Sequence, residues 1–232
     1  ADLENMLNEA AIGAARESKT QINMVDLEEA ATKVKMGPQK KRTQTDEDRK
    51  MTAYHEVGHA ITTWAQKDMD PVHRISIVSR GMSLGHTLVQ PKNDIIHMTK
   101  TKLLSQITMM MGGRAAEELV FGEITTGASN DIDKATMVAR NMVMEYGMSS
   151  LGPINYGPQQ DAIDWGRVYY EQTLISPDMQ NKIDAEVKKI IDTAYKNAVV
   201  ILKKNKKKMD KVVVRLLETE NMDGDEFVKL MG

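Results

Sequence analysis

Apolar residues recur every three to four positions in several stretches of this chain, a period that predicts helices. The first stretch covers residues 2–17, and a shorter one covers 24–35. A Gly-Pro pair and a basic run follow. Because that composition disfavours regular structure, we expect a linker over residues 37–45.

The next helical pattern begins with a capping signal. Thr45 can cap a helix, and Asp48 stands three residues later, as in a capping box. The pattern predicts a helix over 46–66. Two short alternating segments, "HRISIVSRG" and "GHTLVQP", follow on either side of a glycine-containing turn. They predict a small β-hairpin that ends at Pro91.

Helical patterns and polar loops alternate along the rest of the chain. The expected helices cover 99–120, 131–147 and 176–203, the loops cover 121–130 and 149–160, and one or two shorter helices finish the chain. Together these patterns predict a mainly α fold with one small hairpin.

Composition narrows the possible partners and chemistry. The net charge of the 232 residues is −2, which gives no overall attraction to nucleic acid. Cysteine is absent, so disulfides, cysteine-bound zinc and a thiol nucleophile are excluded. No run approaches the roughly 18 apolar residues of a membrane span, and we expect the chain itself to be soluble.

The segment "YHEVGHA", residues 54–60, carries the strongest chemical signal. Residues four apart on a helix are about 400° apart, so His55 and His59 share a face within about 40°. Two imidazoles in that position can bind one zinc ion. A chance pair on a solvated helix is the ordinary alternative, but H-E-x-x-H is the specific pattern of zinc metalloproteases.

Glu56 stands beside the first histidine. It is rotated about 100° from His55, so it cannot easily be a ligand of the same metal. It can reach a water molecule whose pKa zinc lowers toward about 7, and can act as general base. Gly58 lies in the middle of this helix, where it costs about 1 kcal/mol relative to Ala. We therefore expect another backbone or a substrate to approach closely there.

A catalytic zinc ion requires a third protein ligand. The remaining histidines are more typical of surface positions: His73, His86 and His97. Carboxylates are the better candidates: Glu117, Glu118, Asp131 and Asp133. An acid in the first turn of a helix can instead serve only to stabilise the helix dipole. The residues alone leave this choice open.

Several motifs, in order, resemble a known family. "MTAYHEVGHA", "MMGGRAAEELVFGEITTGASNDIDKAT", "ARNMVMEYGMSSLGP" and "DGDEF" are similar to the protease domain of FtsH-type ATP-dependent zinc metalloproteases. The opening "ADLENMLNEAAIGAARESKTQINMVDLEEA" resembles the small helical lid that ends the family's AAA+ module. The resemblance covers essentially the whole chain.

The resemblance implies roles for particular residues. His55 and His59 match the family's zinc ligands, and Glu56 matches its catalytic base. Asp131 matches the third ligand. Glu117 matches an acidic position near the site, where it would orient a histidine. The family, rather than the spacing, selects Asp131 over the other carboxylates.

The resemblance also implies an organisation. Residues 1–36 would be a lid remnant that contributes little to activity, 37–45 a linker, and 46–232 a zinc endopeptidase domain for unfolded or membrane proteins. Substrate would lie extended along "GHTLVQP". No phosphate-binding G-x-x-x-x-G-K-[ST] is present, so ATP would be used by an ATPase module of the parent protein.

That parent would be membrane-anchored and hexameric, with this domain on the cytoplasmic or organelle-interior side. One alternative function remains open. The chain could be a non-catalytic module that assembles the hexamer, with its 18 methionines filling adaptable contacts between subunits.

Overall fold

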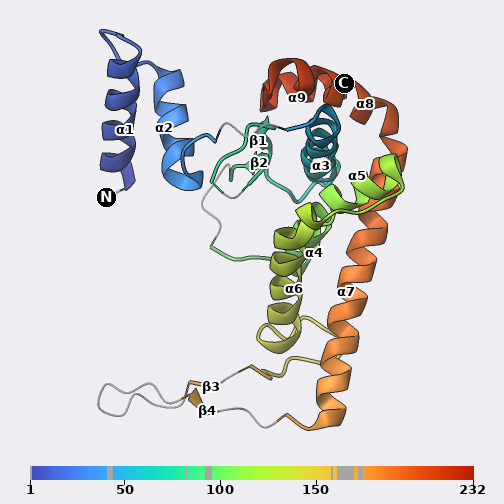
Figure 1. The fold of residues 1–232 in the computed structure, drawn as a ribbon. Coiled ribbons are helices and arrows are strands. Elements are labelled where there is room, and N and C mark those ends of the chain that lie inside the picture. Colours follow the sequence, from blue (N-terminus) through green and yellow to red (C-terminus); the bar gives the residue numbers. More distant parts are fainter. Residues whose placement is uncertain are drawn as a thin grey trace, which may run out of the picture.

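The computed structural model describes residues 2–40, 44–81, 83–91, 96–157, 159–160, 170–171 and 175–232. Within these residues the protein is mainly helical and has a small antiparallel sheet, which confirms the predicted fold class (Figure 1). Parts of the predicted linker and of the hairpin turn, residues 41–43 and 82, lie outside the described residues.

Helix α3, Asp46–Trp64, lies at the centre of the fold. Its N-terminus has the predicted capping box, because the Thr45 side chain accepts from the amide of Asp48, and the Asp48 carboxylate accepts from the amide of Thr45. The helix ends two residues earlier than expected. Nearly every residue from 52 to 63 is buried, so the predicted metal-binding segment is in the core of the protein and not on a solvated surface.

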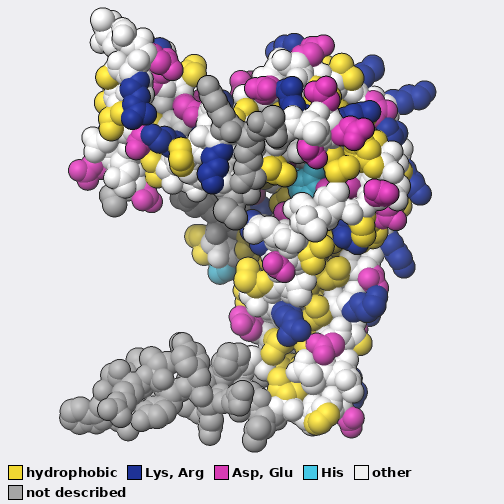
Figure 2. All heavy atoms as spheres, in the orientation of Figure 1, with side chains coloured by type: hydrophobic (Ala, Val, Ile, Leu, Met, Phe, Trp, Pro, Cys, Tyr) yellow, Lys and Arg dark blue, Asp and Glu magenta, His cyan; other side chains and the backbone are white. Residues whose placement is uncertain are grey.

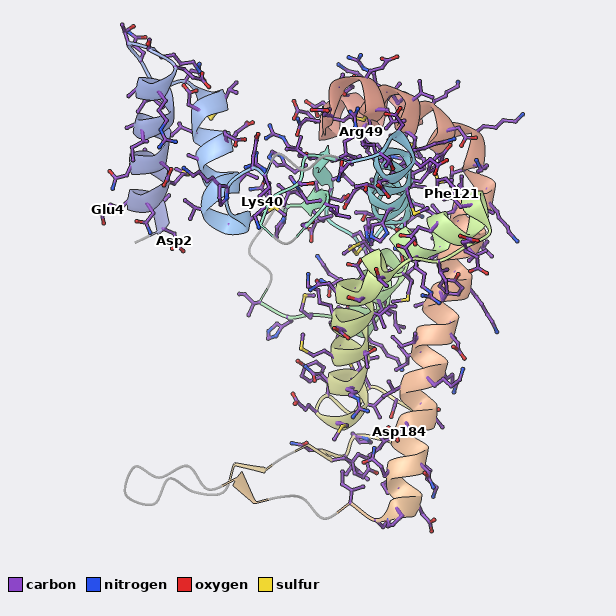
Figure 3. The ribbon with its side chains drawn as sticks, in the orientation of Figure 1. Asp2, Glu4, Lys40, Arg49, Phe121 and Asp184 are labelled. Atoms are coloured by element: carbon purple, nitrogen blue, oxygen red, sulfur yellow. The ribbon has the colours of Figure 1, made fainter. Side chains whose placement is uncertain are left out.

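The helix predicted over 99–120 is two helices. Helix α4, Lys100–Met110, ends at Met111, and α5, Gly112–Phe121, begins directly after it. Two consecutive glycines at the start of α5 lower the helix propensity at this point. The bend turns α5 across α3, where the Tyr54 and Phe121 rings pack edge to face at 5.5 Å between centroids. Phe121 is labelled on α5 in Figure 3.

A long helix supports the others. Helix α7, Pro177–Lys204, packs along α4, α5 and α6 (Figure 1). Ser176 caps it, and the helix begins at Pro177, one residue after the predicted start. Helix α6, Ser129–Met144, starts two residues before the predicted position and follows a short 3₁₀ turn, η1, Thr126–Ala128. Helices α8, Lys206–Thr219, and α9, Gly224–Met231, complete the core.

The sheet contains the predicted hairpin and one additional strand. Strands β1, Val72–Ser76, and β2, His86–Val89, pair antiparallel. Strand β5, Asn221–Asp223, joins the other edge of β1, so the order is β2-β1-β5. A second small sheet pairs β3, Gln159–Gln160, with β4, Tyr170–Glu171, and β3 falls in a segment that we expected to be loop.

The N-terminal helices form a hairpin beside the sheet. Helix α1, Asp2–Arg16, packs on α2, Met24–Met36. The sheet lies between α2 and α3 in Figure 1. None of the described helices is long and apolar enough to span a membrane.

The expected close approach at Gly58 is confirmed. A Cβ atom on Gly58 would lie 2.4 Å from the carbonyl oxygen of Gly112 and 2.8 Å from the Cβ of Ala116. A Cβ atom on Gly112 would lie 2.5 Å from the Thr62 hydroxyl oxygen. Real Cβ atoms do not approach this closely, so α3 and α5 can cross at this distance only because both positions are glycine.

The crossing predicts an unusual effect of alanine. Gly58→Ala should lower the free energy of unfolding by about 1–3 kcal/mol through overpacking, although alanine has the better helix propensity. Gly13→Ala in α1 is the matched control, because no atom lies within 4 Å of its added Cβ, and it should not destabilise. Chemical denaturation measures both. Equal effects of the two substitutions would contradict the close crossing.

Candidate metal centre

Three of the predicted site residues converge at one point. His55 and His59 come from the middle of α3, and Asp131 comes from the first turn of α6. The two Nε2 atoms are 3.0 Å apart, and Oδ2 of Asp131 is 3.2 Å from the Nε2 of His55 and 3.4 Å from that of His59. Histidine side chains are visible in a hollow beside α3 and α5 in Figure 2.

These distances fit a zinc ion. Ligand atoms about 2.0–2.1 Å from a tetrahedral zinc lie about 3.3–3.4 Å from one another, close to the three observed separations. The three side chains are the one group of metal-ligating type that comes together among the described residues. Two imidazoles and one carboxylate leave a fourth tetrahedral position open, as catalytic zinc sites require.

The outer nitrogen of each imidazole is held in place. Nδ1 of His59 lies 2.8 Å from the carbonyl oxygen of Met109. A carbonyl oxygen can only accept, so this Nδ1 donates and Nε2 keeps its lone pair. Nδ1 of His55 lies 2.6 Å from Oε1 of Glu117. With both Nδ1 atoms donating, both Nε2 atoms can present lone pairs to a shared cation.

Glu117 also joins α5 to the loop before α6. Its side chain is almost completely buried, and its Oε2 accepts from the backbone amide of Thr125 at 2.8 Å. The carboxylate therefore contacts His55 on one side and the segment leading to Asp131 on the other. Burial raises its pKa, but these hydrogen bonds prevail, so that the pKa of Glu117 is below its ordinary value.

The site favours positive charge. Burial acts to lower the pKa of His55, but hydrogen bonds to Asp131 and Glu117 raise it to about 10. Burial acts to raise the pKa of Asp131, but both histidines hold it well below its ordinary range. The negative surroundings that stabilise a proton on His55 would also stabilise a divalent cation, whose binding releases that proton.

Glu56 lies beside this group and points toward the sheet. It is buried, and burial raises its pKa against the opposing effect of the two histidines. The Thr87 hydroxyl on β2 lies 2.8 Å from Oε2 of Glu56 and 2.9 Å from its backbone carbonyl oxygen. A Cβ atom on Gly85 would lie 2.9 Å from both Cγ and Oε1 of Glu56, so this glycine packs directly against the carboxylate.

A second glycine is required beside the histidines. A Cβ atom on Gly113 would lie 2.4–2.7 Å from three atoms of the His55 ring. Sequence reasoning missed Gly113, Gly85 and Thr87 as site residues. The Gly-Gly pair was the one available signal, whereas Thr87 carries no local signal because it reaches Glu56 only through the fold.

The other candidates lie elsewhere. Glu118 and Asp133 are exposed, as are His73 and His97. The surface position expected for His86 is wrong. It is buried on β2, with both ring nitrogens unpartnered among the described residues. Burial and the nearby arginines lower its pKa to about 4.

Comparisons with known proteins agree with the resemblance. A family model described as Peptidase family M41 matches residues 42–230. The ATP-dependent zinc metalloprotease FtsH of Caldicellulosiruptor bescii is 47% identical over 233 residues, which cover 100% of this chain and 38% of the relative. The protein of the same name from Thermotoga maritima is 44% identical over 235 residues, again covering 100% and 38%.

A third relative, ATP-dependent zinc metalloprotease FtsH 1 of Sphaerobacter thermophilus, is 46% identical over 99% of this chain and 36% of its own length. The chain thus spans little more than a third of the relatives it matches. The family model nevertheless covers most of the chain, and the similarity extends over nearly all of it. On these grounds the chain belongs to peptidase family M41.

Proposed function

We propose that this chain is the proteolytic part of a zinc-dependent endopeptidase. One observation carries the proposal: His55, His59 and Asp131 place three ligand atoms 3.0–3.4 Å apart, with a buried carboxylate, Glu56, beside them. The names of the relatives, which include zinc and metalloprotease, support the same chemistry.

The three side chains are proposed to hold Zn²⁺, with Glu117 orienting His55. When bound, the ion supplies Lewis acidity, which polarises a peptide carbonyl and lowers the pKa of water. Asp131 contributes the negative charge that offsets part of the ion's charge in a partly buried site. Glu117 and the Met109 carbonyl oxygen keep the Nε2 lone pairs of the histidines directed inward.

Glu56 is proposed as the general base and later the general acid. Thr87 holds its Oε2, which leaves Oε1 to take a proton from the attacking water and return it to the leaving amine. Burial raises its pKa, so the group that accepts the proton can also hold it until the amide bond breaks. Gly85 keeps the carboxylate in a narrow range of positions.

Strand β2 is proposed to bind the substrate. It pairs with β1 on one side and is an edge strand among the described residues. An extended polypeptide can add to such an edge through backbone hydrogen bonds, which depend little on side-chain type. Because Thr87 on this strand touches Glu56, a peptide bound there would run past the base. This mode favours unfolded protein substrates.

The remainder of the parent protein is proposed to supply ATP hydrolysis, a membrane anchor and a hexameric ring. The relatives are named ATP-dependent, and this chain spans just over a third of them. Residues 1–36 would be the remnant of the AAA+ lid, 37–45 a linker and 46–232 the protease domain. That domain would lie on the cytoplasmic or organelle-interior side of the membrane.

Replacing the base tests the enzyme assignment. Glu56→Gln should lower kcat/KM for an unfolded substrate about 10²–10⁴-fold, because proton transfer is lost, while bound zinc is unchanged. Glu47→Gln, an exposed position on the same helix, is the matched control and should cleave normally. If Glu56→Gln cleaves as fast as the control, the proposal is wrong and the hexamerisation alternative gains support.

Metal binding tests the third ligand. Asp131→Asn should weaken zinc affinity by more than the roughly 10–100-fold expected when a residue only orients a ligand, because a charged donor is lost. Asp133→Asn makes the same change at an exposed position on the same helix and should leave the affinity unchanged. Competition with a chromogenic chelator measures both. Equal affinities would exclude Asp131 as a ligand.

A further inference from the structure

Two ion pairs connect the N-terminal hairpin to the sheet. Glu28 on α2 pairs with Arg74 on β1 at 2.6 Å. Glu29, the next residue, accepts from Nη2 of Arg80 through both carboxylate oxygens, at 2.6 and 2.7 Å. Both glutamates are on α2, but Arg74 belongs to β1 and Arg80 to the loop between β1 and β2, and the two arginines differ in burial.

Arg80 depends on Glu29 for its charge balance. The Arg80 side chain is 4% exposed, and its Nε and Nη1 atoms have no partner among the described residues. The nearby His86 is 7% exposed, and both of its ring nitrogens are likewise without a hydrogen-bond partner among the described residues. The Glu29 side chain is 46% exposed, so only the arginine side of the pair is buried; removal of Glu29 would leave the buried Arg80 charge without this carboxylate, which is unfavourable. Without Glu29, Arg80 would have to move toward solvent.

Arg74 is in a different position. It is 20% exposed, and it also pairs with Asp223 of β5 at 3.2 Å. Loss of Glu28 would therefore leave Arg74 with a second carboxylate and access to water. The two neighbouring glutamates thus offer a natural comparison, since both contribute to docking the hairpin but only Glu29 neutralises a buried charge that pairs with no other carboxylate among the described residues.

Arg80 belongs to the loop that reaches the proposed base. Its backbone and that of Ser83 exchange hydrogen bonds at 3.0 and 2.8 Å, and the Ser83 hydroxyl donates to the carbonyl oxygen of Gly85. Gly85 packs against the Glu56 carboxylate. A series of contacts therefore runs from Glu29 through the described residues of this loop, 79–81 and 83–85, to Glu56.

The segment after α2 holds the same loop through its backbone. The amide of Lys40 donates to the carbonyl oxygen of Ser79 at 2.9 Å, and the amide of Gly81 donates to that of Pro38 at 3.4 Å. Lys40 is labelled beside this contact region in Figure 3. The ion pair at Arg80 thus adds to backbone hydrogen bonds that already join the N-terminal region to this loop.

We propose that Glu29 is a positioning residue for proteolysis: through Arg80 and Ser83 it holds Gly85 against Glu56, so the N-terminal hairpin sets the rate of the chemical step. This inference rests on the proposed role of Glu56 as base. It replaces the expectation that residues 1–36 contribute little to activity.

Paired substitutions in the full 232-residue chain test this role. Glu29→Gln should lower kcat about 10–100-fold, the order of loss that follows from a misplacement of about 1 Å, with KM little changed. Hydrogen exchange should rise in the peptide containing the 79–85 loop, with or without zinc. Glu28→Gln should leave kcat, and hydrogen exchange in that loop, close to the values of the unsubstituted 232-residue chain. A charge exchange, Glu29→Arg with Arg80→Glu, should restore part of the lost kcat.

The outcomes separate this inference from the proposed function. Equal kcat and equal loop exchange in the Glu28 and Glu29 variants would overturn the positioning role, even if the unsubstituted chain cleaves normally. A change in KM alone would also overturn it and would indicate a role in binding. If the unsubstituted chain fails to cleave with zinc bound, the proposed function is wrong. Hydrogen exchange in the loop still decides whether Glu29 holds the loop in place.

Discussion

The crossing of α3 and α5 through paired glycines is the constraint on which the site depends. Because Gly58 and Gly112 carry no side chains, the two helices approach closely enough for Gly113 to lie against the His55 ring. The same approach brings Glu117 within 2.6 Å of His55. Glu117 in turn binds the loop that leads to α6, and α6 carries the third proposed ligand. The packing of two helices thus determines the geometry of the site.

The site concentrates groups that are unfavourable together in the absence of a cation. The Nε2 atoms of His55 and His59 lie 3.0 Å apart, where two lone pairs directed at each other repel. A buried carboxylate, Glu56, lies next to them. Conflicts of this kind are expected at functional sites, where local stability is lower so that the groups are already positioned for chemistry. A divalent cation would resolve the conflict by neutralising charge and accepting the lone pairs.

Local sequence patterns predicted the structural features that depend on one helix alone. The capping box at Thr45 and the shared helix face of His55 and His59 follow from helix geometry alone, and both are present in the structure. The approach at Gly58 was also predictable, because a glycine within a helix requires a reason. The break at Met111 was missed, since it arises where α5 turns across α3.

Contacts between distant segments could not be predicted in this way. Spacing did not distinguish Asp131 from Glu117, and the family resemblance made that choice. Thr87 and Gly85 reach Glu56 only because β2 folds over α3. His86 was expected at the surface but is buried, because its environment is formed by the sheet and the arginines around it. The short strand β5 was missed because three residues give no recognisable alternation.

The proposed chemistry depends on one zinc ion held by two imidazoles and one carboxylate. A crystal structure of the zinc-loaded chain, with anomalous diffraction measured at the zinc absorption edge, tests it most directly. We expect one strong peak per chain, about 2.0–2.2 Å from Nε2 of His55, Nε2 of His59 and a carboxylate oxygen of Asp131. A peak bound by Glu117 in place of Asp131, or one away from both histidines, would contradict it.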